Sequence, residues 1–266
     1  MLMTVANLIS LGAVPAFIVL DLFYRRREFS RPRFWRPLAL AVSVGTFFLS
    51  VQIAVAWAGL VGERTVLDLA FLGTWAGAAV GIVVYEFLHY WYHRLAHNSR
   101  SPFRRWHQMH HAAEANDAWG AYYIHPIDTF MFTTLGSLVF FPLLGLTPAA
   151  GAVGGAFLVF NAAFQHANIR TPRWLGYVIQ RPESHSVHHG RGYHRNNYSD
   201  LPLWDIVFGT FENPADPVAA CGFWDGASNR LGDLLLGRNV TRRPRAGALN
   251  ADVPAAERPR TVETAA

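Results

Sequence analysis

The sequence predicts an all-α integral membrane protein, a bundle of spanning helices with a smaller helical cap on one side of the bilayer. Of its 266 residues, 52% are hydrophobic and only 15% are charged, which is well below the charged share of an ordinary soluble domain. The apolar residues gather in long runs. Most of the twelve histidines recur three or four residues apart, the spacing that places side chains on one face of a helix.

The apolar runs predict five membrane spans. About 20 residues cross the hydrocarbon core of a bilayer, and each run is long enough to do so. The expected spans are residues 4–24, 37–62, 66–90, 126–146 and 148–166. Pro142, Gly145 and Pro148 mark a tight turn between the last two spans, which therefore form a hairpin. Positive charge follows the first run instead of preceding it, so we expect an uncleaved span and not a signal peptide.

Arginine clusters predict the orientation of the spans. The loop after the first span is expected in the cytoplasm because it holds Arg25, Arg26, Arg27, Arg31, Arg33 and Arg36. Counting spans forward brings residues 91–125 and the chain after residue 166 to the same side, so every histidine group is expected there. All 23 basic residues are arginine, which we interpret as the codon bias of a GC-rich bacterial genome. The bacterial inner membrane is the expected location.

Charge and cysteine content exclude several classes of site. The net charge of +5 comes from short arginine clusters beside apolar spans, and no nucleic-acid-binding motif occurs, so we expect no nucleic-acid partner. Cys221 is the single cysteine. It excludes an intrachain disulfide, a thiolate zinc finger and a cysteine-ligated iron–sulfur cluster. Any metal in this chain must be held by nitrogen or oxygen.

The histidines form three groups with helical spacing. His93 and His97 form an H-x-x-x-H pair, and residues 107–111 and 185–189 both read H-x-x-H-H. Imidazole is a ready ligand for iron, zinc, copper and nickel. Eight imidazoles in three groups are more than one mononuclear site can use. The pattern therefore predicts a pair of metals.

These groups resemble the histidine boxes of the fatty acid hydroxylase / sterol desaturase superfamily. Residues 86–97, EFLHYWYHRLAH, resemble the first box, and residues 106–111, WHQMHH, resemble the second. The third box is similar to HSVHH at 185–189, and the segment that usually follows it is similar to residues 197–210. An H-x-N element between the boxes is matched by FQHAN at 164–168.

The resemblance implies a membrane-embedded oxidase that uses two non-haem irons and O2. Its reaction would be hydroxylation, or else desaturation, of a C–H bond in a lipid such as a sterol, a fatty acyl chain or a carotenoid. Zinc is redox-silent and cannot supply the oxidant that such a bond requires. By resemblance, the metal ligands are His93, His97, His107, His110, His111, His166, His185, His188 and His189.

The resemblance covers about residues 80–210 and suggests three regions. We expect N-terminal spans over 1–79, a catalytic domain over 80–212 that includes the hairpin, and a Pro/Ala/Arg-rich tail over 213–266 that is disordered from about residue 240. The chain has no dinucleotide fingerprint, haem motif or cysteine cluster. A separate electron donor, such as a reductase, a ferredoxin or a cytochrome-type protein, is therefore implied.

Carboxylates near the boxes are candidates for orienting the ligand rings through hydrogen bonds. The candidates are Glu86, Asp117, Glu183, Asp200 and Asp205. The three remaining histidines are more typical of other roles. We interpret His89 as a buried hydrogen-bonded residue and His194 as part of a surface loop. His125 is expected either to have a structural role or to hydrogen-bond to a metal ligand.

Two other functions are considered. A membrane zinc hydrolase would offer few histidines and a catalytic glutamate, as in H-E-x-x-H, and that motif does not occur. A metal transporter would carry ionisable residues in the middle of its spans. Asp21, Asp68 and Glu86 all lie near span ends. Both alternatives fit the sequence less well than an oxidase.

Overall fold

The computed structural model describes residues 2–24 and 27–243. This part of the chain is nearly all helical, and its β pairing is a single antiparallel bridge between Gly190 and Cys221. The disorder predicted from about residue 240 falls mostly on residues 244–266, which lie outside the described residues. The all-α fold class predicted from the sequence is confirmed.

Five helical segments are long and apolar enough to cross a membrane, and the chain is an integral membrane protein. They are α1 (Leu2–Phe23), α2 (Trp35–Val61), α3 (Gly73–Ala96) with the short helix η1 (Ala70–Leu72) before it, α5 (Pro126–Leu138) with the π-helical η3 (Val139–Leu143) after it, and α6 (Pro148–His166). Each corresponds to one predicted span. The largest difference is at α3, which continues past the predicted end at residue 90 to Ala96.

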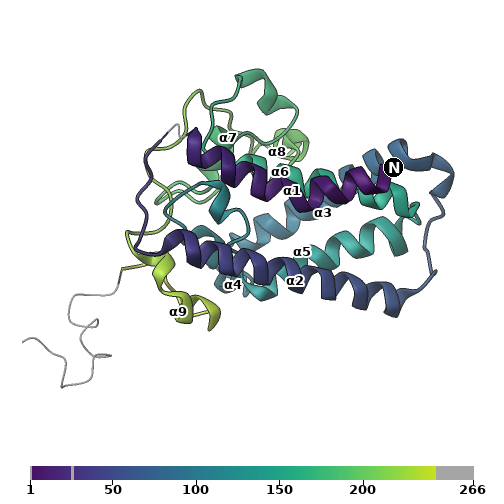
Figure 1. Ribbon diagram of the computed structural model, residues 1–266, viewed down its shortest axis with the longest axis horizontal. Coiled ribbons are helices and arrows are strands. Elements are labelled where there is room, and N and C mark those ends of the chain that lie inside the picture. Colours follow the sequence, from purple (N-terminus) through teal and green to yellow (C-terminus); the bar gives the residue numbers. More distant parts are fainter. Residues whose placement is uncertain (1, 25–26, 244–266) are drawn as a thin grey trace, which may run out of the picture.

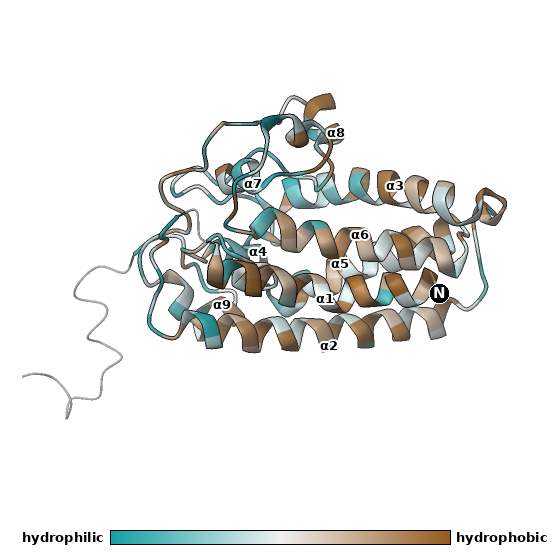
Figure 2. Ribbon diagram, turned by 45° about the horizontal axis from the view of Figure 1, so that its top comes forward, coloured by the Kyte–Doolittle hydropathy of each residue, from teal (hydrophilic) through white to brown (hydrophobic). Residues whose placement is uncertain are grey.

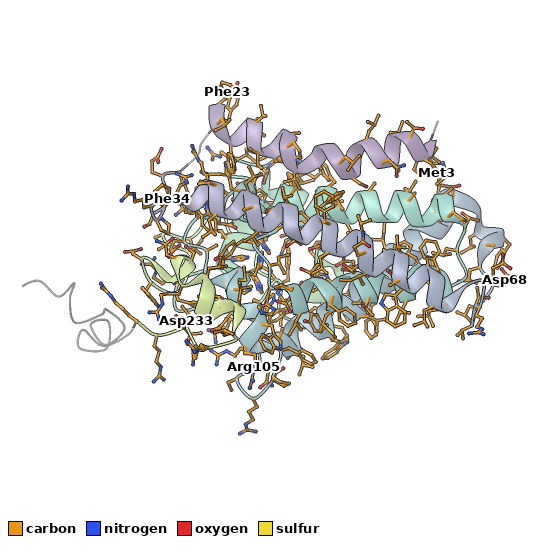
Figure 3. The ribbon with its side chains drawn as sticks, turned by 60° about the horizontal axis from the view of Figure 1, so that its bottom comes forward. Met3, Phe23, Phe34, Asp68, Arg105 and Asp233 are labelled. Carbon is orange, nitrogen blue, oxygen red and sulfur yellow. The ribbon has the colours of Figure 1, made fainter. Side chains whose placement is uncertain are left out.

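Successive spanning helices run in opposite directions, so their ends gather at the two opposite ends of the bundle. α1, α3 and α6 run toward the cap, and α2 and α5 run away from it (Figure 1). α1 and α3 both pack on α6, and α2 packs on α5. Met3 and Asp68 mark the end far from the cap, whereas Phe23, Phe34, Arg105 and Asp233 lie at the cap end (Figure 3).

The predicted hairpin between α5 and α6 is present. Gly145 has φ +60° in the turn, and a Cβ atom there would lie 2.2 Å from the backbone oxygen of Leu67. Glycine is therefore required both for its left-handed backbone and for its lack of a side chain. Thr147 then caps α6 by accepting a hydrogen bond from the backbone N–H of Ala150 at 3.2 Å, and Pro148 occupies the first helical turn.

The outer faces of the bundle are apolar, as contact with lipid requires. Leu8, Phe48, Val55 and Trp75 are each at least 61% exposed and face outward from their helices. Hydrophobic residues follow the spanning helices, whereas hydrophilic residues gather in the cap (Figure 2). Such exposed side chains would be unfavourable in water and are favourable in hydrocarbon.

The cap consists of short helices at one end of the bundle. They are α4 (Arg104–His111), η2 (Ala118–Gly120), η4 (Arg173–Tyr177), α7 (Pro182–His188), α8 (Pro202–Val207), η5 (Ala227–Asn229) and α9 (Leu231–Leu235). The segment that includes α9 packs against α4. The Gln108 amide donates a hydrogen bond to the Arg238 carbonyl at 2.7 Å and accepts one from the Val240 N–H at 3.0 Å. The arginine-rich loop after α1 lies at the same end, where Arg31 contacts Asp117 at 3.1 Å.

Candidate metal centre

Four helix ends meet at the border between the bundle and the cap, and each carries histidines. α3 carries His93 and is followed directly by His97, and α6 ends at His166. α4 carries residues 107–111, and residues 185–189 lie on α7 and its C-terminal cap. Helical spacing puts the histidines of each helix on one face of that helix. Where the four helix ends meet, these faces point toward one another.

The nine histidines named by the family resemblance all come together here, in two adjoining groups. The five-histidine group consists of His93, His97, His107, His111 and His188. The four-histidine group consists of His110, His166, His185 and His189. Within each group, one nitrogen atom from every ring lies within 4.8 Å of the others. The groups touch where the rings of His111 and His189 stack, with centroids 4.3 Å apart.

The Nε2 atoms point inward and approach one another closely. In the five-histidine group, His93 and His188 are 2.9 Å apart at Nε2, and His107 and His111 are 3.0 Å apart. The Nε2 distances in the four-histidine group are 3.2 Å for His110–His166, 3.2 Å for His166–His185 and 3.0 Å for His185–His189. Adjacent ligands at right angles around an ion with metal–nitrogen bonds of about 2.1 Å would be about 3 Å apart.

The hydrogen bonds at the opposite ring nitrogens fix the tautomer. Nδ1 of His93 lies 2.6 Å from the Tyr198 carbonyl oxygen, and Nδ1 of His188 lies 2.7 Å from that of Asn196. A carbonyl only accepts, so each Nδ1 carries the proton and each neutral ring presents a lone pair at Nε2. Two lone pairs facing each other at 2.9 Å repel. A metal cation shared by these atoms would turn that repulsion into coordination, so the donor set fits a metal site.

Burial favours the neutral form of four imidazoles that lie outside the spanning helices. Outside the spanning helices, burial lowers the pKa of His110, His111, His188 and His189 well below the ordinary value of 6.5, and neighbouring imidazoles lower it further. Desolvation disfavours the charged form, and the adjacent rings would repel a second positive charge. Neutral imidazole is the form that binds metals.

One ring is held by a carboxylate that no motif in the sequence marks. Nδ1 of His107 donates to Oδ2 of Asp128 at 2.9 Å, and the Tyr92 hydroxyl donates to Oδ1 at 2.6 Å. This carboxylate–histidine arrangement is typical of metal sites, because it fixes the tautomer and makes the ligand more basic. The available signal is its place in the first turn of α5, three residues after His125.

The five carboxylates expected to orient ligand rings make other contacts, and most of these fix loops around the site. Asp117 accepts from Arg31 and from the Trp35 indole. Glu183 accepts from Thr171 and contacts Arg181. Glu86 accepts from the backbone N–H of Asp200, Asp200 from the Gln165 amide, and Asp205 from the N–H groups of Tyr198 and Ser199.

The three remaining histidines occupy different places. The ring of His194 lies beside the site, with its centroid 5.3 Å from that of His111 and 4.8 Å from that of Phe223. His89 lies one helical turn before His93, stacks on it with centroids 5.4 Å apart, and joins Glu86 and Asp200 in a buried cluster. His125 caps α5: its Nδ1 accepts from the N–H of Ile127 at 3.0 Å, and its Nε2 donates to the Leu235 carbonyl at 3.1 Å. The structural interpretation of His125 therefore fits both of its ring contacts.

A cavity of about 340 Å³ connects the histidines with the interior of the bundle. Its walls come from α2, α3, α5 and α6, and both histidine groups contribute to its lining through residues that include His93, His107, His110, His166 and His185. Along α6 the lining extends from His166 back to Gly155, a helical length of ~16 Å. Phe132, Leu158 and Val159 make this part apolar.

Comparison with known proteins places this site in a family. A model of the family described as fatty acid hydroxylase matches residues 78–210, the segment that carries all nine histidines. The chain belongs to the fatty acid hydroxylase family. No solved structure matches the chain.

Several curated proteins are similar to this chain over part of its length. Very-long-chain aldehyde decarbonylase GL1-9 of Oryza sativa subsp. indica is 29% identical, over 49% of this chain and 52% of the relative. Sphinganine C4-monooxygenase 1 of Arabidopsis thaliana is 25% identical, with the same coverage of 49% and 52%. Ornithine lipid hydroxylase OlsE of Rhizobium tropici is 33% identical, over 52% of this chain and 42% of the relative. The chain thus spans about half the length of these relatives, or less.

Proposed function

We propose that this protein is a non-haem di-iron oxidase that uses O2 to hydroxylate a C–H bond of a membrane lipid, with residues 80–212 as the catalytic domain. The observation that carries the proposal is the pair of histidine groups whose Nε2 atoms converge at 2.9–3.2 Å beside a cavity between spanning helices. A nitrogen-rich site beside a largely apolar cavity between spanning helices suits the oxidation of an apolar substrate.

The nine histidines are the proposed ligands, five for one iron and four for the other. Iron supplies the redox chemistry that activates O2 for attack on an unactivated C–H bond, which zinc does not supply. The rings themselves contribute neutral donors held in fixed orientation. Asp128 holds the His107 ring by accepting a hydrogen bond from its Nδ1, so that Nε2 faces the proposed metal.

The cavity supports a substrate with a long apolar chain and a polar group near the site of oxidation. Phe132, Leu158 and Val159 would contact the chain, over the ~16 Å that the cavity follows α6. At the histidine end, Gln165 and Asp200 offer hydrogen bonds to a hydroxyl or amide. Relatives named for sphinganine and ornithine lipid suggest substrates that combine such a chain with a polar head group.

Electrons would reach the site from the cap. A second cavity of about 490 Å³ is lined by His97, His111 and three arginines, Arg104, Arg195 and Arg242. Its position supports the approach of a separate electron donor, a reductase, ferredoxin or cytochrome-type protein, from the side opposite the lipid. The arginine-rich loop after α1, at the cap end of the bundle, supports a cytoplasmic location of the cap. The proposed membrane is a bacterial inner membrane.

Relatives named aldehyde decarbonylases suggest a second candidate reaction. The same site would then act on a long-chain aldehyde and release a hydrocarbon one carbon shorter, with the carbonyl carbon leaving as a one-carbon product. The cavity accommodates either apolar chain, so the product distinguishes the two reactions.

The test is oxygen labelling in cells that express the chain. Membranes from cells grown under 18O2 are compared with membranes from cells that express His110→Ala or His188→Ala, one ligand from each group. We expect hydroxylated lipids that carry one 18O atom in cells that express the wild-type chain, and no such lipids in cells that express either variant. Shortened hydrocarbons would indicate the decarbonylase, and new unsaturated lipids without label would indicate a desaturase. Equal lipid profiles in all three strains would contradict the proposal.

A further inference from the structure

One loop holds three of the five rings in the five-histidine group. Alternate residues of the segment 194–198 turn their carbonyl oxygens to three Nδ1 atoms, each of which donates a hydrogen bond. The pairs are His97 to His194 at 2.8 Å, His188 to Asn196 at 2.7 Å and His93 to Tyr198 at 2.6 Å. In the four-histidine group, Nδ1 of His166 donates to Ala162 in its own helix at 2.8 Å.

The loop has a backbone conformation that needs support. His194, Asn196 and Asn197 have φ values of 43°, 65° and 50°, in the left-handed region. Residues other than glycine adopt this region at a cost, with asparagine the most tolerant. Such a conformation persists where the surrounding contacts determine it. The contacts that hold this loop therefore also hold the three rings.

Asn197 anchors the middle of the loop. Its side chain is 1% exposed, and its Nδ2 donates to the carbonyl oxygens of Ser184 at 2.8 Å and Glu212 at 3.0 Å. Its Oδ1 accepts from the N–H of Glu212 at 2.7 Å. Three hydrogen bonds thus tie residue 197 to α7 on one side and to the segment after α8 on the other.

Asp205 anchors the end of the loop from α8. Its Oδ1 accepts from the N–H of Tyr198 at 2.8 Å, and its Oδ2 accepts from the N–H and hydroxyl of Ser199 at 2.9 and 2.8 Å. Thr210 donates to Oδ1 at 2.7 Å. The Tyr198 carbonyl, which meets His93, belongs to the residue that this carboxylate holds.

We propose that Asn197 and Asp205 are positioning residues that set the affinity of one metal position, the one bound by the five-histidine group. The inference rests on the proposed metal centre. Without the loop carbonyls, the ring protons are free to move from Nδ1 to Nε2, and the lone pairs no longer face the metal. The contacts of the loop carbonyls are with rings of the five-histidine group, so the four-histidine position keeps its affinity.

The test isolates each metal position before the loop is changed. His185→Ala leaves the five-histidine position as the complete one, and His111→Ala leaves the four-histidine position. Asp205→Asn and Asn197→Ala are added separately to each background, and the metal-free proteins are titrated anaerobically with Fe2+ in detergent. We expect binding to be 10- to 100-fold weaker with either loop substitution in the His185→Ala background. In the His111→Ala background, we expect no change.

Glu114→Gln is the matched control. Glu114 is a buried carboxylate that accepts three hydrogen bonds from Gly226 and Ser228, and it holds a loop that does not belong to the 194–198 segment. We expect it to leave both positions unchanged. Asp205→Asn keeps the shape of the side chain, so it tests the inference even where Asn197→Ala fails to fold.

Two results would overturn the inference alone: a wild-type chain that binds two Fe2+ while the loop substitutions weaken neither position, or while they weaken both equally. A wild-type chain that binds no Fe2+ would overturn the proposed metal centre, and this inference with it. Circular dichroism of each variant, compared with that of Glu114→Gln, shows whether helix content is retained.

Discussion

The two histidine groups lie side by side but are held in different ways. The five-histidine group is oriented from outside, by the carbonyls of the 194–198 loop and by Asp128 on α5. In the four-histidine group, the orienting bond of His166 comes from its own helix, and His185 and His189 share α7 and its cap. Helical spacing therefore brings the nitrogens together in both groups, whereas in the five-histidine group contacts from outside the histidine-bearing helices determine where the ring lone pairs point.

The groups also face different surroundings. Three of the four rings in the four-histidine group line the bundle cavity, namely His110, His166 and His185. The five-histidine group reaches both cavities, because His107 lines the bundle cavity and also the arginine-lined cavity of the cap. In the proposed oxidase, the four-histidine metal would lie on the lipid side and the five-histidine metal between the lipid and the electron donor.

The largest effect is expected from removing one ligand of either group. His188→Ala and His110→Ala each leave a metal position without one of its donors, and both irons are needed for the proposed reaction. We expect lipid oxidation to fall to the background level in both variants, measured as 18O-labelled product in membranes supplied with reductant. If one variant keeps its activity, the histidine group that contains the substituted residue is dispensable. That result would contradict a role for both groups in the reaction.

Asp128→Asn is expected to have the next largest effect. The amide that replaces one carboxylate oxygen keeps the shape of the side chain but removes the negative charge behind His107. Loss of such a partner typically costs 10- to 100-fold in metal affinity or activity. The control is Tyr92→Phe, which removes the other hydrogen bond to Asp128 and leaves the ring contact in place. Equal losses in both variants would show that the charge is unimportant.

Much of this site could be predicted from the sequence, because helical spacing is a local property. The nine ligand candidates follow from the histidine boxes and the family resemblance, and the spans follow from apolar runs. Asp128 is different: it is twenty-one residues from His107, and only the packing of α4 against α5 brings them together. The carbonyls of the 194–198 loop leave no signal at all, since every residue has a carbonyl.

The expected roles of Glu86 and Asp205 illustrate the same limit. Both are buried acids close to the histidine boxes, and the sequence makes them candidates for ring orientation. Both instead bind backbone N–H groups in the segment 198–201. A sequence shows that a carboxylate is near a metal site, but its partner depends on which loop folds against it.

A smaller effect is expected from shortening the bundle cavity. Gly155 lines the cavity on α6, and a Cβ atom there meets nothing within 4 Å, so Gly155→Leu would project into free space. We expect oxidation of a long-chain substrate to fall roughly ten-fold, because a bulky side chain in a hydrophobic pocket discriminates by about this factor. Iron content should stay unchanged. Gly59→Leu, also unobstructed and not among the lining residues, is the control.

The smallest effect concerns the stability of the metal-free protein. Burial lowers the pKa of His110, His111, His188 and His189 below 6.5, so the unfolded chain binds more protons than the folded chain once the pH falls below that value. Stability is then lost with acidification. We expect the unfolding temperature in detergent to fall between pH 7.5 and 5.5, and to fall less in a His110→Ala variant. A pH-independent unfolding temperature would contradict this account of the neutral rings.

The most direct test of the central claim is the iron content of the purified chain. Protein prepared from cells supplied with iron is analysed for all transition metals against a measured protein concentration. Two irons per chain, reduced to about one in a variant that lacks two rings of one group, such as His185→Ala/His189→Ala, is the result predicted here. One tightly bound zinc per chain, or a metal content that the double substitution leaves unchanged, would contradict it.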